Sequence, residues 1–242
     1  MLPILFRSNG IVFYSYPLLM GLGWGVAYQI FFDLLPEAFT RKRAQILFWG
    51  LFAFSWVGAK VFFLYTVPRD LSANLLQDSS FWLGGGFVFY GGFLGGLFYL
   101  LILRALRFPV SREVLWAMVP ALTIGHAIGR IGCLLAGCCY GKQTDLFWGI
   151  YLHGTHRHPT QIIEAVLLLA LGIYLLRSRM PKTYLVSTYL LSYGAIRLLG
   201  EALRGDLIRG QWGPLTPSQW VSVVLLMTGL VLLKKANYSK RL

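Results

Sequence analysis

Apolar residues occur in seven long runs separated by short polar and basic segments. A helix needs about 20 predominantly apolar residues to cross a bilayer, and a run of 17 is near the lower limit. The pattern predicts an all-α integral membrane protein in which residues 1–242 form one polytopic domain with seven transmembrane helices. We expect the spans at residues 13–36, 45–67, 81–103, 114–136, 160–176, 183–200 and 216–233.

The composition excludes a water-soluble protein. Hydrophobic residues make up 57% of the chain, charged residues 13%, and the mean hydropathy is +0.63, whereas soluble domains carry about 25% charged residues. The same arithmetic excludes disorder, a coiled coil and a disulfide-rich miniprotein. The start of the chain lacks the features of a cleavable signal peptide, so we expect the first span to remain in the mature protein.

The distribution of Lys and Arg predicts the orientation and explains the net charge of +13. Thirteen of the 22 basic residues fall in one alternating set of loops, six in the other set and three inside spans. Cytoplasmic loops are enriched in Lys and Arg, so we expect the N-terminus outside and the C-terminus in the cytoplasm. Basic loops between apolar runs suit anionic lipid rather than nucleic acid. The longest outer loop, at about 137–159, is long enough to suggest function.

Ionisable residues inside the spans are the strongest functional signal, because a charge at bilayer depth is costly and usually has a role. Four such residues are expected near the outer face: Arg130, Glu164, Arg197 and Glu201. Lys60 is a weaker case, since its long stem can reach the interface. Other polar residues are expected at the same face, namely Tyr16, Tyr90, His158 and Gln161.

These charges have two interpretations. Arg–Glu pairs can simply hold helices together, or the arginines can bind an anion, because guanidinium forms bidentate contacts with phosphate. Arg197 and Glu201 share a helix face, Arg204 continues that face, and Asp206 either neutralises Arg204 or caps the helix. A phospholipid headgroup is the simplest anion at this depth.

Glycines and cysteines leave further alternatives open. The tracts GGGFVFYGGFLGG (84–96) and GRIGCLLAGCCYG (129–141) permit close helix packing or a backbone beside a headgroup. The three cysteines, Cys133, Cys138 and Cys139, are interpreted as small packing residues, as a disulfide from Cys133 to one of the pair, or as reactive thiols beside Arg130. No CxxC or HxxxH pattern occurs, so we expect no metal and no cofactor.

Several motifs together resemble the prolipoprotein diacylglyceryl transferase family over most of the chain. They are GRIG (129–132), HPTQIIEA (158–165), YGAIRLLGEALRGD (193–206), the opening YSYPLLMGLG (14–23) and YGGFLGG (90–96). The chain departs from the family's usual pattern at three positions: Tyr90 replaces a histidine, Cys133 an asparagine and Cys138 a glutamate.

The resemblance implies a bacterial inner-membrane enzyme whose active site faces the outer leaflet. It implies transfer of the diacylglyceryl group from phosphatidylglycerol to the lipobox cysteine of a prolipoprotein, with release of glycerol phosphate. The implied partners are phosphatidylglycerol, or a related anionic phospholipid, and a signal-peptide helix; we expect a monomer. The implied catalytic residues are Arg130, Arg197, Glu201, Tyr90 and His126, and the implied substrate-binding residues are Tyr16, Tyr193, Arg204, Gly129, Gly132, His158, Gln161 and Glu164.

In this scheme Arg130 and Arg197 clamp the phosphate, Glu201 orients Arg197, and Arg204 holds the leaving group or a gate. The base that deprotonates the acceptor thiol stays open among His126, Glu164, Glu201 and the field of the arginines themselves. Two other functions also stay open. One is a related phospholipid-dependent transferase with a different acceptor and a cysteine nucleophile, and the other is a lipid-binding or transport protein without enzymatic activity.

Overall fold

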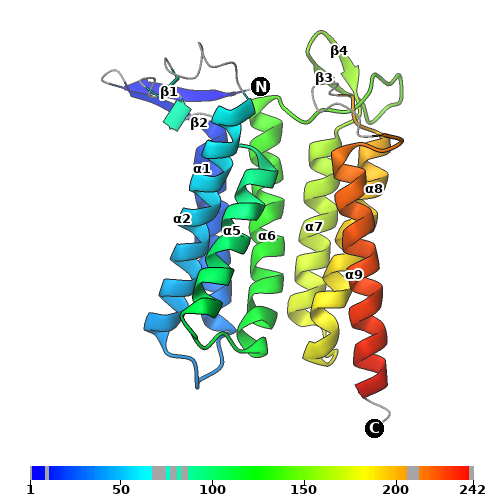
Figure 1. The fold of residues 1–242 in the computed structure, drawn as a ribbon. Helices are drawn as coiled ribbons and strands as arrows, with labels where there is room; N and C mark the ends of the chain where they lie inside the picture. Colours follow the sequence, from blue (N-terminus) through cyan, green and yellow to red (C-terminus); the bar gives the residue numbers. More distant parts are fainter. Residues whose placement is uncertain are drawn as a thin grey trace.

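A computed structural model describes residues 2–8, 11–66, 75–76, 81–82, 87–205 and 213–239. In this part of the chain seven long helices run along a common axis (Figure 1). A single 3-10 turn, η1 (Lys182–Tyr184), precedes the sixth of them. The helices are α1 (Ser15–Asp33), α2 (Arg41–Thr66), α5 (Phe89–Ala105), α6 (Arg112–Ala136), α7 (Thr160–Arg177), α8 (Leu185–Ala202) and α9 (Pro217–Ser239).

Each long helix coincides with one predicted apolar run, and the third helix departs furthest from its predicted span. Helix α5 begins at Phe89, whereas the apolar run suggested a start at residue 81. Glycine has a low helix propensity, and three consecutive glycines at 84–86 interrupt the run. Residues 83–86 lie outside the described part of the chain.

Two short hairpins accompany the helices, so the chain is mostly rather than entirely helical. Strand β1 (Ile4–Ser8) pairs antiparallel with β2 (Ile11–Tyr14), and β3 (Ile150–Leu152) pairs antiparallel with β4 (Thr155–Arg157). Helix α1 begins two residues after the expected start of the first span, because the aromatic and β-branched segment IVFY favours a strand. Both hairpins lie at one end of the bundle, and the C-terminus lies at the other (Figure 1).

Glycines set the distance between neighbouring helices. A side chain on Gly91 or Gly95 of α5 would overlap backbone carbonyl oxygens of α2. A Cβ on Gly23 of α1 would lie 2.6 Å from the carbonyl oxygen of Gly125 of α6. The described glycines of the tract 84–96 therefore act as a packing surface, one of the two interpretations of that tract, because small residues let membrane helices approach closely.

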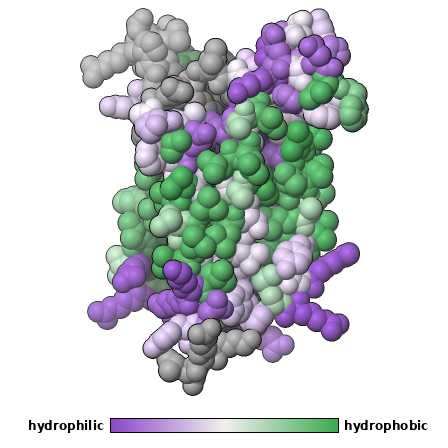
Figure 2. Space-filling model, turned by 90° about the vertical axis from the view of Figure 1, so that its right-hand side faces the viewer, coloured by the Kyte–Doolittle hydropathy of each residue, from purple (hydrophilic) through white to green (hydrophobic). Residues whose placement is uncertain are grey.

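The outer surface suits a bilayer. Among the described residues, four helical segments are long and apolar enough to cross a membrane: Arg41–Tyr65, Arg112–Ala136, Thr160–Arg177 and Pro217–Tyr238; Tyr90–Ala105 is apolar but shorter. On the face shown in Figure 2, a broad hydrophobic band covers the middle of the molecule, with hydrophilic side chains toward both ends.

Candidate functional site

A chain of ion pairs joins α6, α7 and α8 near the end that carries the hairpins. Glu164 Oε2 lies 2.7 Å from Arg130 Nη2 and 3.8 Å from Arg197 Nη1. Glu201 Oε2 lies 2.6 Å from Arg197 Nη2 and 3.9 Å from Arg204 Nε. All five side chains are at least nine-tenths buried. We call these five residues the arginine network.

The arginine network contains more positive charge than its own pairing requires. Three guanidinium groups face two carboxylates, which leaves one excess positive charge. Within the described part of the chain, the buried Nε of Arg130 has no hydrogen-bond acceptor. Buried polar groups normally have partners, so this N–H group and the excess charge together favour an anionic ligand over a purely structural clamp.

Two residues at the start of α9, Thr216 just before the helix and Ser218 within it, make contacts that sequence reasoning missed. Arg197 Nη2 donates to the Ser218 hydroxyl at 2.8 Å, and the Thr216 hydroxyl donates to Glu201 Oε1 at 3.0 Å. Thr216 also accepts from the backbone N–H of Gln219, whose side chain accepts from the Thr216 N–H. This reciprocal pair is a capping box, and the sequence TPSQ was the signal that could have located it.

Two predicted residues lie next to the arginine network on the same helices. The His126 ring meets the Tyr193 ring edge-on, with centroids 5.2 Å apart, and Tyr193 stacks on Tyr189 at 5.8 Å. His126 precedes Arg130 by four residues on α6, and Tyr193 precedes Arg197 by four on α8, so each lies one helical turn from an arginine.

The predicted residues near α1 and α5 have different surroundings. A Cβ on Gly132 would lie 3.3 Å from the Tyr16 ring, so Gly132 packs against α1, whereas nothing lies within 4 Å of a Cβ on Gly129. Gly129 therefore borders open space beside Arg130. Tyr90 lies in the first turn of α5, the helix that packs on α2, and its role stays a prediction.

Lys60 does not extend to the surface. Its side chain is buried and donates to the carbonyl oxygen of Phe81. Its ammonium group lies 4.4 Å from the ring centroid of Phe81 and 3.9 Å from that of Phe87. Cation–π attraction to these rings offsets part of the cost of burying the charge. The phenyl ring of Phe87 in turn lies 6.1 Å from that of Tyr16.

The loop 137–159 packs over the ends of α7 and α8. The Lys142 N–H donates to the Leu203 carbonyl, and the Gly141 N–H to the His158 carbonyl. His158 Nδ1 accepts from the Trp148 indole at 3.1 Å, so His158 holds the loop together. The predicted neighbour of Arg204, Asp206, lies outside the described residues.

The three cysteines converge beside Arg130. Arg130 Nη1 lies 3.8 Å from Cys133 Sγ. Hydrogen bonding to the Cys133 thiol raises the pKa of Cys138, whereas hydrogen bonds from both other thiols, assisted by the charges of Arg130 and Arg204, lower the pKa of Cys139.

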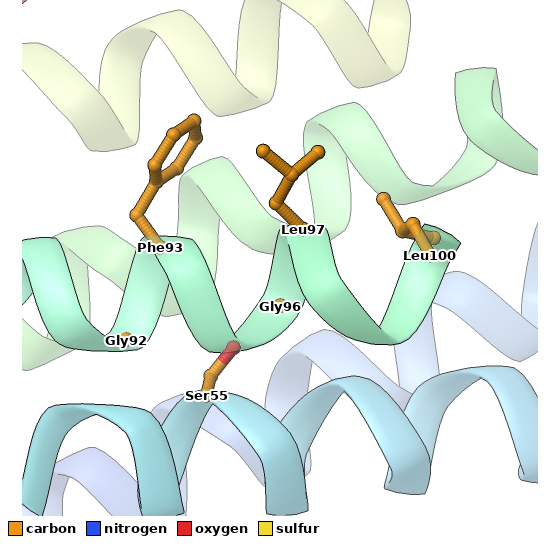
Figure 3. Close-up of a pocket in the computed structure, with 6 residues that line it drawn as sticks. All are labelled: Ser55, Gly92, Phe93, Gly96, Leu97 and Leu100. Atoms are coloured by element: carbon orange, nitrogen blue, oxygen red, sulfur yellow. The ribbon is translucent and has the colours of Figure 1, made fainter. Parts of the chain in front are cut away.

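A shallow pocket of about 200 Å³ lies on α2 and α5, away from these residues. Its lining is almost entirely apolar, and Figure 3 shows Ser55 pointing from α2 toward α5 while Phe93 and Leu97 point away from α2. It shares no residue with the arginine network. Its lining residues are Ser55, Gly92, Phe93, Gly96, Leu97 and Leu100.

Comparison with known proteins gives consistent results. The prolipoprotein diacylglyceryl transferase family model matches residues 3–234. A phosphatidylglycerol–prolipoprotein diacylglyceryl transferase of Clostridium tetani is 29% identical over 260 residues, covering 100% of both chains. A second such protein, from Clostridium perfringens, is 31% identical over 237 residues, covering 92% of this chain and 91% of its own. The motifs and these matches agree: the chain belongs to the prolipoprotein diacylglyceryl transferase family.

Proposed function

We propose that this protein transfers the diacylglyceryl group of phosphatidylglycerol to the lipobox cysteine thiol of a prolipoprotein and releases glycerol phosphate. A phosphatidylglycerol–prolipoprotein diacylglyceryl transferase from Clostridium tetani matches the whole length of the chain. The observation that carries the proposal is the arginine network, whose excess positive charge and unpartnered Arg130 Nε suit the phosphate of a lipid headgroup.

The same proposal includes seven transmembrane helices with the N-terminus outside. Basic residues mark the helix ends opposite the arginine network, including Arg41 at the start of α2, Arg112 at the start of α6 and Arg177 at the end of α7. The positive-inside rule places that end in the cytoplasm of a bacterial cell. The arginine network then lies toward the outer leaflet, where a signal-peptide helix emerging from translocation can reach it.

The reaction needs a leaving phosphate to be stabilised as the carbon–oxygen bond breaks. Arg130 and Arg197 hold the phosphate, and charge that develops there is best stabilised by donors already in place. Glu201 and Ser218 both accept hydrogen bonds from Nη2 of Arg197 and so fix its orientation. Glu164 lies between both arginines and sets their separation. Gly129 leaves space beside Arg130 for the lipid.

A direct test combines purified protein, phosphatidylglycerol in detergent and a lipobox peptide. We expect the peptide mass to rise by one diacylglyceryl group while glycerol phosphate appears in equal amount. A serine-for-cysteine peptide is the matched control. Glycerol phosphate release without a change in the cysteine peptide would contradict the proposal and favour a transferase with another acceptor. The departures at Tyr90, Cys133 and Cys138 are the reason to include that second candidate.

A further inference from the structure

The end of α6 brings the three cysteines together through a defined backbone turn. Gly137 adopts the left-handed conformation with φ of 73°. The Cys138 N–H donates to the Cys133 carbonyl, and the Gly137 N–H donates to the Leu134 carbonyl. These two bonds form a Schellman motif, which folds the chain back over the last turn of the helix. Consequently the sulfur atoms of Cys133, Cys138 and Cys139 all lie within 4.8 Å of one another.

Three side chains hold this turn at successive carbonyl groups. His153 Nε2 donates to the Gly137 carbonyl at 2.7 Å. Gln161 donates to the Cys138 carbonyl and Thr160 to the Cys139 carbonyl, both at 2.8 Å. A site whose backbone is fixed by surrounding hydrogen bonds needs little reorganisation to bind a ligand. The loop and the start of α7 thus pre-position the sulfur cluster.

The spacing of the sulfurs is close to that of a zinc site. Zinc–sulfur bonds of about 2.3 Å in a tetrahedral arrangement place sulfur atoms roughly 3.8 Å apart, so small side-chain rotations suffice to bind the ion. Catalytic zinc sites have three protein ligands and keep the fourth position open. Cys138 is exposed, which leaves this cluster accessible from outside. Three thiolates and one Zn²⁺ carry a net charge of −1, which the adjacent Arg130 can offset.

We propose that Cys133, Cys138 and Cys139 bind Zn²⁺ and that its fourth position takes the thiol of the acceptor cysteine as a thiolate. This proposal rests on the proposed function and deepens it. A thiol that coordinates a metal ion loses its proton, so the zinc site replaces a general base in a chain with tyrosine at position 90. The ion sits beside Arg130, so the activated thiolate lies next to the phosphate-binding group.

The step balances without any oxidant or reductant. On coordination the acceptor thiol releases one proton to solvent. The thiolate electron pair then forms the sulfur–carbon bond, while the electrons of the carbon–oxygen bond leave with the glycerol phosphate held by Arg130 and Arg197. Zinc stays in the +2 state. The product thioether is neutral and a weaker ligand than a thiolate, so it dissociates.

The chain has three cysteines in total, so any metal–thiolate signal in the absence of peptide reports this cluster. We expect purified protein to bind one Zn²⁺ by elemental analysis, and Co²⁺ loaded in its place to show thiolate-to-cobalt charge-transfer absorption. A Cys133→Ser/Cys138→Ser/Cys139→Ser variant should lose both signals. Cys138→Ser, at an exposed position, provides a folded variant if the triple replacement does not fold. Absence of bound metal, or a protein mass two units lower from a disulfide, would overturn the proposal.

Acceptor binding and turnover complete the test. Adding the lipobox peptide should strengthen the cobalt–thiolate band, and the serine-for-cysteine peptide should not. Removing zinc should lower transfer at least about 100-fold, the contribution typical of a group that handles the reacting proton, and zinc should restore it. Full transfer by metal-free protein would overturn the zinc site and leave the proposed function intact. No transfer by zinc-loaded protein would contradict the proposed function, while the response of the cobalt band to the peptide still decides the zinc site.

Discussion

Replacing Arg130 with glutamine separates a phosphate-binding role from a structural one. The Arg130 side chain is about nine-tenths buried, and its Nη2 lies 2.7 Å from Glu164 Oε2. The Arg130→Gln variant removes the guanidinium charge and keeps a polar side chain of similar width. It also removes the excess positive charge of the arginine network, because two arginines then face two carboxylates.

Two effects of different size are expected. Loss of a preorganised donor to the leaving phosphate should cost about 3–4 kcal/mol in the transition state, or about 10²–10³-fold in kcat. Breaking a buried ion pair costs about 3–5 kcal/mol of stability. Arg197 Nη1 remains 3.8 Å from the same carboxylate oxygen, so we expect a value near the lower end of that range.

A double variant distinguishes the two roles. Arg130→Gln/Glu164→Gln also removes the carboxylate that has lost its closer partner and restores one excess positive charge, so thermal unfolding in detergent should recover most of the lost stability. Transfer to a lipobox peptide, measured by mass spectrometry, should stay low. If the double variant instead transfers at nearly the wild-type rate, Arg130 serves only to neutralise Glu164, and its assignment to the phosphate is refuted.

Three further outcomes follow from the packing. Because a side chain at Gly95 would overlap a carbonyl oxygen of α2, Gly95→Ala should lower the free energy of unfolding by about 1–3 kcal/mol. A Cβ at Gly129 has nothing within 4 Å, so Gly129→Ala should leave the free energy of unfolding unchanged or raise it by up to about 1 kcal/mol. Equal shifts of the unfolding temperature in the two variants would contradict the close packing at Gly95. Ser218→Ala removes the 2.8 Å bond to Arg197 and should lower kcat by about tenfold without changing KM for the peptide; an unaltered kcat would mean that the bond does not position Arg197. Thr216→Val removes the cap of α9 and should destabilise the protein by about 1 kcal/mol, so thermal unfolding at the wild-type temperature would argue against the capping box.

The sequence predicted which charged residues form the site more accurately than it predicted how they pair. Burying a charge in lipid is costly enough that Arg130, Glu164, Arg197 and Glu201 stand out without any structure. Their convergence near one end was also predicted, since helix direction alternates along the chain. The pairing was not: Glu164 contacts both Arg130 and Arg197, and that depends on how each helix is rotated about its axis.

The cysteines show a different limit of sequence reasoning. Their spacing matches no common metal-binding motif, so the sequence pattern predicted no metal. Their geometry arises from a Schellman turn at Gly137 together with hydrogen bonds from the loop and from α7. These partners come from segments far along the chain, and local spacing carries no information about them.

The sequence by itself determined the helices, the membrane setting and the family, because long apolar runs and spaced motifs are local properties of the chain. Tertiary structure decided which charges pair, that Ser218 and Thr216 join the arginine network, and that three sulfur atoms lie within 4.8 Å of one another. Those outcomes depend on the depth and rotation of each helix, which the close glycine contacts between neighbouring helices help to set.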